Sequence, residues 1–308
     1  MIDVKLLTKR YDDYEAVRGI SFTVEKGEIF GFIGPNGAGK TTTIRILATL
    51  LDLTGGDVTV AGHSVVSDPE KVRRALGFMP DLFGVYDRIT VWEYLDFFGA
   101  AYGLARRERH AVIEQIIQLT DLGDLREKLC DALSKGMKQR LCLAKTLIHD
   151  PQVLVLDEPA SGLDPRARIE FRALLKELCA MGKTIFLSSH ILTELSDVCS
   201  SVAIMEKGRL VACGPLDSIM SRLRSRHVYE LHVLDKVAEA RAMIEKSGLT
   251  SDLKDQDHTL RFSFDGAPPQ LAELVKALAA ADIPVVGLVK EQQDLEDAFM
   301  QLTRGEVQ

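Results

Sequence analysis

The residue types best suited to chemistry stand together in one short loop, which reads Gly34-Pro35-Asn36-Gly37-Ala38-Gly39-Lys40-Thr41-Thr42. The loop matches the phosphate-binding pattern Gly-x-x-x-x-Gly-Lys-[Ser/Thr] at every fixed position. Glycines let a backbone approach phosphate oxygens without a Cβ in the way, and the backbone N–H groups can then bind the anion. We expect Lys40 to bridge the terminal phosphates of a nucleotide and the Thr41 hydroxyl to hold Mg²⁺. The alternative, a Gly-rich turn with a surface lysine, fits the complete pattern less well.

Two elements must position this loop. Glu28–Ile33 is a short apolar run typical of a buried strand, and Thr42–Leu51 has the pattern of a helix. A loop between a strand and a helix can direct several N–H groups at one anion, while the N-terminus of the helix adds positive potential. The context therefore favours a nucleotide site.

A second group of chemical residues follows another predicted strand. Val153–Leu156 is entirely apolar, and Asp157 and Glu158 come directly after it. A central strand would bring both carboxylates to the C-terminal edge of an open α/β sheet, where ligands bind. We expect Asp157 to bind Mg²⁺. We expect Glu158 to point elsewhere, as successive strand residues do, and to polarise water. The alternative is an ordinary turn at the end of a strand.

His190 stands at the end of a further predicted strand, Thr184–Ser188, and lies 33 residues after Asp157. A lone histidine is more often a core or surface residue than a site residue. Its position beside Ser188 and Ser189, at the strand end next to the two carboxylates, favours a role at the site.

Further strands are predicted at Val4–Thr8, Ile20–Val24 and, antiparallel, Asp57–Ala61. Tyr11 lies on the link between the first two strands. It is either a packed surface aromatic or a plate on which a nucleotide base can stack. A terminal hairpin is predicted from Val202 to Ala212.

The segment from Asp81 to about Asp131 is predicted to be a helical insert. Thr90–Leu104 has apolar residues at helical spacing, and Thr90 with Glu93 fits a capping box. A second helix is predicted at Arg106–Thr120. The many aromatic residues of this insert can pack in a core or can line a groove for a helix of another protein.

The composition changes to a polar joint near Gly214–Arg226. We expect a catalytic domain over residues 1–215, a linker over 216–226 and an accessory domain over 227–308. The last part has the element order strand, helix, strand, strand, helix, strand, which is ferredoxin-like, and an additional helix is predicted at Leu295–Leu302. Since it shows no catalytic cluster, we interpret it as an accessory or dimerising module.

Composition narrows the class of protein. The formal net charge of −7 disfavours a nucleic-acid-binding surface. The five cysteines are scattered and odd in number, which indicates a reducing compartment rather than disulfides or a metal site. The N-terminus lacks the apolar region of a signal peptide, and no apolar run approaches the roughly 20 residues that span a bilayer. We therefore expect a cytoplasmic protein whose membrane role, if any, requires a partner.

Residues 1 to about 215 resemble the nucleotide-binding domain of ABC transporters, with every motif in order. Tyr11 falls at the adenine-stacking aromatic, Val153–Glu158 resembles Walker B with its catalytic glutamate, and His190 falls at the switch histidine. Leu133–Arg140 resembles the family signature, and Ser161–Asp164 resembles the loop that couples the two sites of a dimer. The C-terminal residues, ending in Asp294–Thr303, are similar to the accessory domain of ATPases that serve ABC-2-type exporters.

The resemblance implies an α/β fold of P-loop NTPase type, with a mixed sheet core, an antiparallel β subdomain and a helical subdomain, followed by the small ferredoxin-like α+β domain. It also implies a head-to-tail dimer in which ATP and Mg²⁺ lie between the phosphate loop of one copy and Ser134 and Gly136 of the other. Asp164 would contribute from the coupling loop. A membrane permease would dock against Asp81–Tyr102, which places the protein at the inner face of the cell membrane.

Three residues depart from the family pattern. Asp81 replaces a glutamine that reaches Mg²⁺, Lys135 replaces a signature glycine and Met137 replaces the signature glutamine. Lys135 can add positive charge near ATP at a dimer interface or can be a solvated side chain. Two other functions stay open: a non-transport ABC ATPase acting in DNA repair or on ribosomes, and a nucleotide-sensing regulatory module without turnover.

Overall fold

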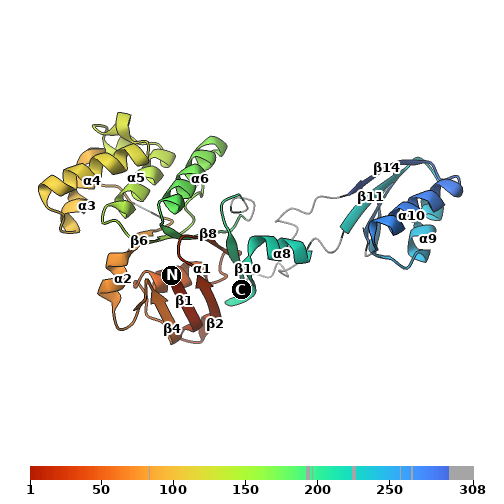
Figure 1. Ribbon diagram of the computed structural model, residues 1–308, viewed down its shortest axis with the longest axis horizontal. Coiled ribbons are helices and arrows are strands. Elements are labelled where there is room, and N and C mark those ends of the chain that lie inside the picture. The colour runs from red at the N-terminus through yellow and green to blue at the C-terminus, as the bar shows by residue number, and fades with distance from the viewer. Residues whose placement is uncertain are drawn as a thin grey trace. The chain divides into compact units, whose positions relative to one another are not determined.

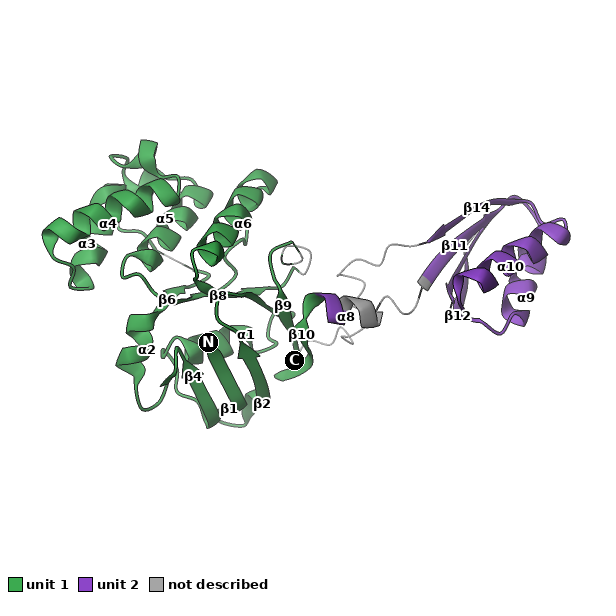
Figure 2. Ribbon diagram, viewed as in Figure 1, with its two compact units in different colours: residues 1–216, 299–308 green, residues 217–298 purple. Residues whose placement is uncertain are grey.

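The computed structural model describes residues 1–82, 84–191, 195, 197–223, 227–256, 258–264 and 266–290. One compact unit comprises Met1–Leu216, and the other comprises the described residues from Asp217 to Lys290 (Figures 1 and 2). None of the described helices combines the length and the apolar character required to cross a membrane.

The centre of the first unit is a sheet with strand order β10-β9-β3-β8-β7-β6. Neighbouring strands in it are parallel except for β10, which forms the predicted antiparallel hairpin with β9. The phosphate-loop strand β3, its neighbour β8 and the next strand β7 are buried along their whole length. Because their carboxyl ends meet at one edge, the loops that follow them share that edge. The strands are β3 (Ile29–Ile33), β6 (Leu76–Met79), β7 (Val153–Leu156), β8 (Thr184–Ser189), β9 (Ser201–Glu206) and β10 (Arg209–Pro215).

A second, antiparallel sheet has the order β2-β1-β4-β5. The strand predicted at Asp57–Ala61 is confirmed as β4 and pairs antiparallel with β1. The two sheets and α1 share one core, in which Phe22 of the second sheet stacks on Phe30 and Phe186 of the first. Helix α2 (Pro69–Ala75) leads back to β6. The remaining elements are β1 (Ile2–Tyr11), β2 (Tyr14–Val24), β4 (Gly55–Val60), β5 (His63–Ser64) and α1 (Lys40–Leu47).

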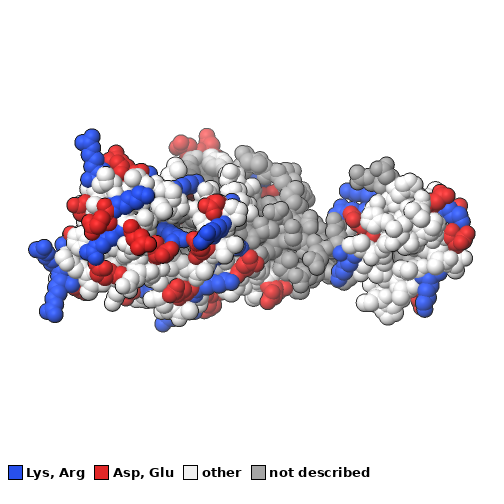
Figure 3. Space-filling view, turned by 90° about the horizontal axis from the view of Figure 1, so that it is seen from above, with Lys and Arg blue, Asp and Glu red and all other residues white. Residues whose placement is uncertain are grey.

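The insert from Asp81 to about Asp131 is helical, as predicted, and it lies apart from the antiparallel sheet (Figure 1). The capping box is confirmed: the Thr90 N–H donates to Glu93 Oε2 at 2.7 Å, and the Glu93 N–H donates to Thr90 Oγ1 at 3.2 Å. On the face seen in Figure 3, positive and negative side chains are interspersed. The helices of the insert are α3 (Val91–Ala101) and α4 (Arg106–Leu119), followed by short 3₁₀ turns η1 (Gly123–Leu125) and η2 (Cys130–Ala132). Helices α5 (Lys135–Leu147) and α6 (Pro165–Ala180) come after the insert.

The second unit has the predicted ferredoxin-like order, and its antiparallel sheet runs β12-β13-β11-β14. It has its own core, which includes Leu231, Phe262 and Leu278. The polar joint begins as a helix, α8. Phe83, residues 192–194 and 196, residues 224–226 and the predicted helix Leu295–Leu302 lie outside the described residues. The elements are α8 (Leu216–Leu223), β11 (His227–Val233), α9 (Val237–Lys246), β12 (Thr250–Gln256), β13 (Thr259–Phe264), α10 (Pro268–Ala280) and β14 (Val285–Lys290).

Candidate active site

The phosphate loop joins β3 to α1, as predicted, and two of its glycines are required by close packing. Gly39 adopts φ +105°, and a Cβ there would lie 2.5 Å from the carbonyl oxygen of Ala16. A Cβ on Gly34 would lie 2.3 Å from the carbonyl oxygen of Met205. Since real side chains cannot occupy those positions, both residues must be glycine for the loop to seat against its neighbours.

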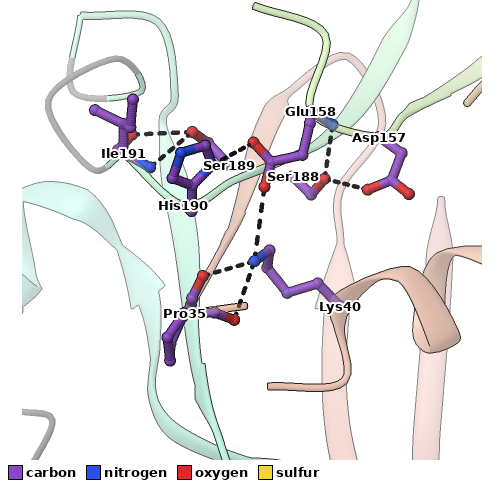
Figure 4. Close-up of polar contacts among 9 residues, drawn as sticks. Pro35, Lys40, Asp157, Glu158, Ser188, Ser189, His190 and Ile191 are labelled. Carbon is purple, nitrogen blue, oxygen red and sulfur yellow. Dashed lines mark hydrogen bonds and ion pairs between the residues drawn. The ribbon is translucent and has the colours of Figure 1, made fainter. Parts of the chain in front are cut away.

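Lys40 is buried at the start of α1 and points along the loop (Figure 4). Its Nζ donates to the carbonyl oxygen of Gly34 at 2.6 Å and to that of Pro35 at 3.2 Å. The same atom lies 3.6 Å from Glu158 Oε1. Burial lowers the pKa of the Lys40 ammonium from its usual 10.5, while the charges of Glu158 and Asp157 oppose that shift.

Asp157 directly follows β7 and is almost fully buried, with 3% of its surface exposed. Its Oδ1 accepts a hydrogen bond from Ser188 Oγ at 2.7 Å. Burial raises the pKa of the Asp157 carboxyl, hydrogen bonds from Ser188 and Thr41 act against the rise, and the nearby Glu158 and Asp81 add to it. Hydroxyl and carboxylate oxygens are the ligands that Mg²⁺ prefers, so Thr41, Asp157 and Asp81 fit this metal chemically.

Glu158 faces the phosphate loop for a reason that the sequence did not indicate. Glu158 lies beyond the end of β7, and its backbone adopts a left-handed φ of +49°. The prediction that strand alternation sets the direction of this side chain is therefore wrong. The Glu158 N–H donates to Ser188 Oγ at 2.9 Å, and its Oε2 lies 2.8 Å from His190 Nδ1 (Figure 4). One carboxylate thus links His190 to Lys40. Such a backbone outlier is typical of functional sites.

Lys40, Glu158 and His190 border one cavity of about 390 Å³ beside the loop, whereas Asp157, Gly34 and Ala38 are not among its bordering residues. Tyr11, at the end of β1 rather than on a separate link, borders it together with Asp81. Two bordering residues, Tyr14 and Ala16, were not predicted from the sequence, and Ser161 was expected only as part of the loop that couples two sites. The predicted residues that border the cavity are Tyr11, Pro35, Asn36, Gly37, Gly39, Lys40, Thr41, Thr42, Asp81, Glu158 and His190.

Tyr14 could have been found from the hairpin pattern. It is the direct cross-strand partner of Tyr11, and side chains of such partners lie on the same side of a sheet. Both rings are partly exposed, at 41% for Tyr11 and 45% for Tyr14. Lys9 Nζ lies 5.1 Å from the centroid of the Tyr11 ring. The cavity therefore has two aromatic side chains at its edge, where one was predicted.

Ser134, Gly136 and Asp164 are not among the residues that border the cavity of their own chain. Ser134 caps α5 by accepting a hydrogen bond from the Met137 N–H at 3.3 Å. Asp164 caps α6 by accepting a hydrogen bond from the Ala167 N–H at 2.9 Å. This cap, followed by Pro165 at the first helical position, sets the start of α6.

The chain is similar to known proteins in sequence and in fold. Residues 17–161 match the family described as ABC transporter. The ABC transporter ATP-binding protein NatA of Bacillus subtilis is 39% identical over 230 residues, which cover 73% of this chain and 94% of that protein. The Nod factor export ATP-binding protein I of Burkholderia lata is 34% identical over 307 residues, or 100% of this chain and 98% of that protein. A solved ATP-binding subunit of an ABC transporter is 31% identical, with a TM-score of 0.66 over 72% of this chain and 93% of that chain.

Proposed function

The chain belongs to the ABC transporter family of ATP-binding subunits, and on that premise we propose that it powers export through a separate membrane permease. It binds ATP and hydrolyses it. The observation that carries the proposal is the position of Glu158, whose carboxylate lies between Lys40 and His190 at the cavity of the phosphate loop. A nucleotide-sensing module without turnover would not need a carboxylate at that place.

Each residue of the cavity has a proposed role. Lys40 and the loop N–H groups bind the terminal phosphates, and Glu158 accepts a proton from the attacking water. His190, held by Glu158, donates a hydrogen bond to the γ-phosphate. Bound Mg²⁺, held by Thr41 and Asp157, would neutralise charge on the phosphates, with Asp81 close enough to assist. Tyr11 stacks on the adenine base.

A second copy of the chain completes the site in this proposal. Ser134 and Gly136 lie at the start of α5, where a helix N-terminus favours an anion, but they do not border their own cavity. A head-to-tail dimer would bring them, and Asp164, to the ATP bound by the other copy. ATP-driven closing and hydrolysis-driven opening would then move the permease.

Two observations support an exporter with a permease at the inner face of the membrane. The Nod factor export protein aligns over the whole of this chain, including the second compact unit. Tyr86, Phe97 and Tyr102 are each about half exposed, so part of the Asp81–Tyr102 segment presents apolar surface to a partner. We propose residues 1–215 as the ATPase domain, 216–226 as a linker and 227–308 as an accessory domain.

Nucleotide binding and permease capture test the proposal together. Lys40→Ala removes the buried ammonium from the loop, so we expect ATP binding by equilibrium dialysis to be lost, with the fold retained by circular dichroism. Affinity purification from the native membrane should recover a polytopic permease. ATP binding by the Lys40→Ala variant at wild-type affinity would disprove the assignment of the loop, and purification without a permease would argue against transport.

A further inference from the structure

Lys135, which replaces a glycine of the family signature, lies across another motif of the same chain. It is the first residue of α5. A Cβ built on Gly162 would lie 2.1 Å from Lys135 Nζ, 3.2 Å from its Cε and 3.6 Å from its Cδ. The far end of the lysine side chain therefore occupies the space beside Gly162 in which any other residue would place its side chain.

The loop under Lys135 is Ser161–Asp164, and Gly162 adopts φ +68° in its middle. The start of α5 touches this loop at a second place, because a Cβ on Gly136 would lie 3.4 Å from Leu163 Cδ2. Leu163 is buried, and its carbonyl oxygen accepts a hydrogen bond from Arg168 Nε at 3.0 Å. Helix α5 holds one side of the loop, and α6 holds the other.

The same loop is connected to the candidate base. The Ser161 N–H donates to the carbonyl oxygen of Glu158 at 3.0 Å, and Ser161 borders the cavity. Gly162 is the next residue. A displacement of the loop at Gly162 would consequently act on Glu158 through one hydrogen bond, without any contact between Lys135 and the cavity.

The end of the Lys135 side chain makes this contact: Nζ lies nearest to the position of a Gly162 Cβ, and Cε and Cδ lie behind it. In the part of the chain that the structure describes, Lys135 forms no ion pair and no hydrogen bond through its ammonium. Its charge is therefore not what holds it over Gly162.

We infer that Lys135 is a positioning residue, whose side chain fills the space beside Gly162, holds the Ser161–Asp164 loop against the start of α5 and thereby fixes Glu158. The inference rests on the proposed function, since it names a residue that supports the same hydrolytic site. It also accounts for a departure from the family pattern: the lysine at position 135 and the bare Cα of Gly162 fit one another.

Turnover measurements on three variants test this role. We expect Lys135→Ala to lower kcat by about tenfold, because small displacements of a catalytic group are costly, and to leave KM for ATP within about twofold, because Lys135 does not border the cavity. Lys135→Met keeps an unbranched side chain of nearly the same length without the charge and should restore most of the lost kcat. Lys176→Ala, an exposed lysine on α6, is the control and should behave as wild type.

A double-mutant cycle and hydrogen exchange complete the test. Gly162→Ala should cost less kcat in the Lys135→Ala background than alone, since part of its clash is with Lys135. The amides of Ser161 and Leu163 should exchange faster in Lys135→Ala, whether or not the protein turns over. Absence of ATPase activity in the wild type would overturn the proposed function alone. Unchanged exchange and kcat in Lys135→Ala, or a Lys135→Met variant as slow as Lys135→Ala, would overturn the inference.

Discussion

Replacement of Glu158 by Gln isolates the chemistry of one carboxylate from its shape. Gln keeps the size of the side chain and can still hydrogen bond to His190, but it cannot take a proton at neutral pH. A positioned general base contributes about 10²- to 10⁴-fold to a rate. At ~1.36 kcal/mol for each factor of ten, the expected loss is ~2.7–5.4 kcal/mol of transition-state stabilisation.

The same substitution should not weaken ATP binding. Glu158 Oε1 lies 3.6 Å from Lys40 Nζ, with both side chains mostly buried. At an effective dielectric constant of ~20, two unit charges at that distance attract by about 4–5 kcal/mol, less the cost of their desolvation. Glu158 therefore competes with phosphate oxygens for Lys40. Gln removes that competitor, so we expect ATP affinity equal to or tighter than that of the wild type.

The assays are steady-state ATP hydrolysis and molecular mass by size-exclusion chromatography with light scattering, with and without ATP. We expect loss of turnover together with an ATP-dependent dimer. Glu177→Gln, which alters an exposed carboxylate on α6, is the matched control and should leave both properties unchanged. Turnover of Glu158→Gln within about threefold of wild type would refute Glu158 as the base, because a general base contributes far more.

The remaining predictions concern the binding of the adenine base and the buried carboxylate of Asp157. Tyr14→Ala should weaken ATP binding by about fivefold, the lower end of the range for loss of one aromatic stack, while inorganic tripolyphosphate should bind as before. Equal losses of affinity for both ligands would show that Tyr14 does not lie beside the adenine base. Asp157→Asn should abolish Mg²⁺-dependent turnover and yet raise Tm by about 2–4 °C at neutral pH for each ~1 kcal/mol gained. The sign follows from the raised pKa of Asp157 in the folded protein. The contribution of this carboxyl to the free energy of unfolding is fully present below its pKa of 3.8 in the unfolded chain, and it is lost as pH rises through the folded pKa. The Tm gain should therefore vanish in acid, and a lower Tm for Asp157→Asn at neutral pH would contradict the argument.

Local sequence patterns were sufficient to predict structure wherever the backbone conformation of a residue, or a hydrogen bond within the next turn, requires a particular residue type. The phosphate loop could be predicted because Gly39 and Gly34 are the residues that its turns and contacts permit. The caps at Thr90 and Ser134 could be predicted because each bonds within its own helix. In these cases the interaction spans only a few positions of the sequence.

Contacts between distant segments account for what the sequence did not reveal. The direction of Glu158 depends on a left-handed backbone and on Ser188, which lies 30 residues away. Lys135 meets Gly162 only because α5 and the loop before α6 pack together. None of these pairings has a local pattern, so each requires the packed structure.

Charge balance in the cavity explains why one chain should be insufficient. By formal charge, Lys40 supplies one positive charge, whereas the carboxylates of Asp81, Asp157 and Glu158 supply three negative charges in or beside the cavity, a net of −2 for these four residues. A bound triphosphate adds further negative charge to this surplus. Loop N–H groups and Mg²⁺ offset part of this negative charge, but the three carboxylates compete with the phosphates for their positive charge. The N-terminus of α5, which carries Ser134 and no acidic residue in its first turn, is a source of additional positive potential outside the cavity. A second copy that presents this helix to the phosphates would supply what the first lacks, so ATP should promote dimerisation most strongly when Glu158 is neutral.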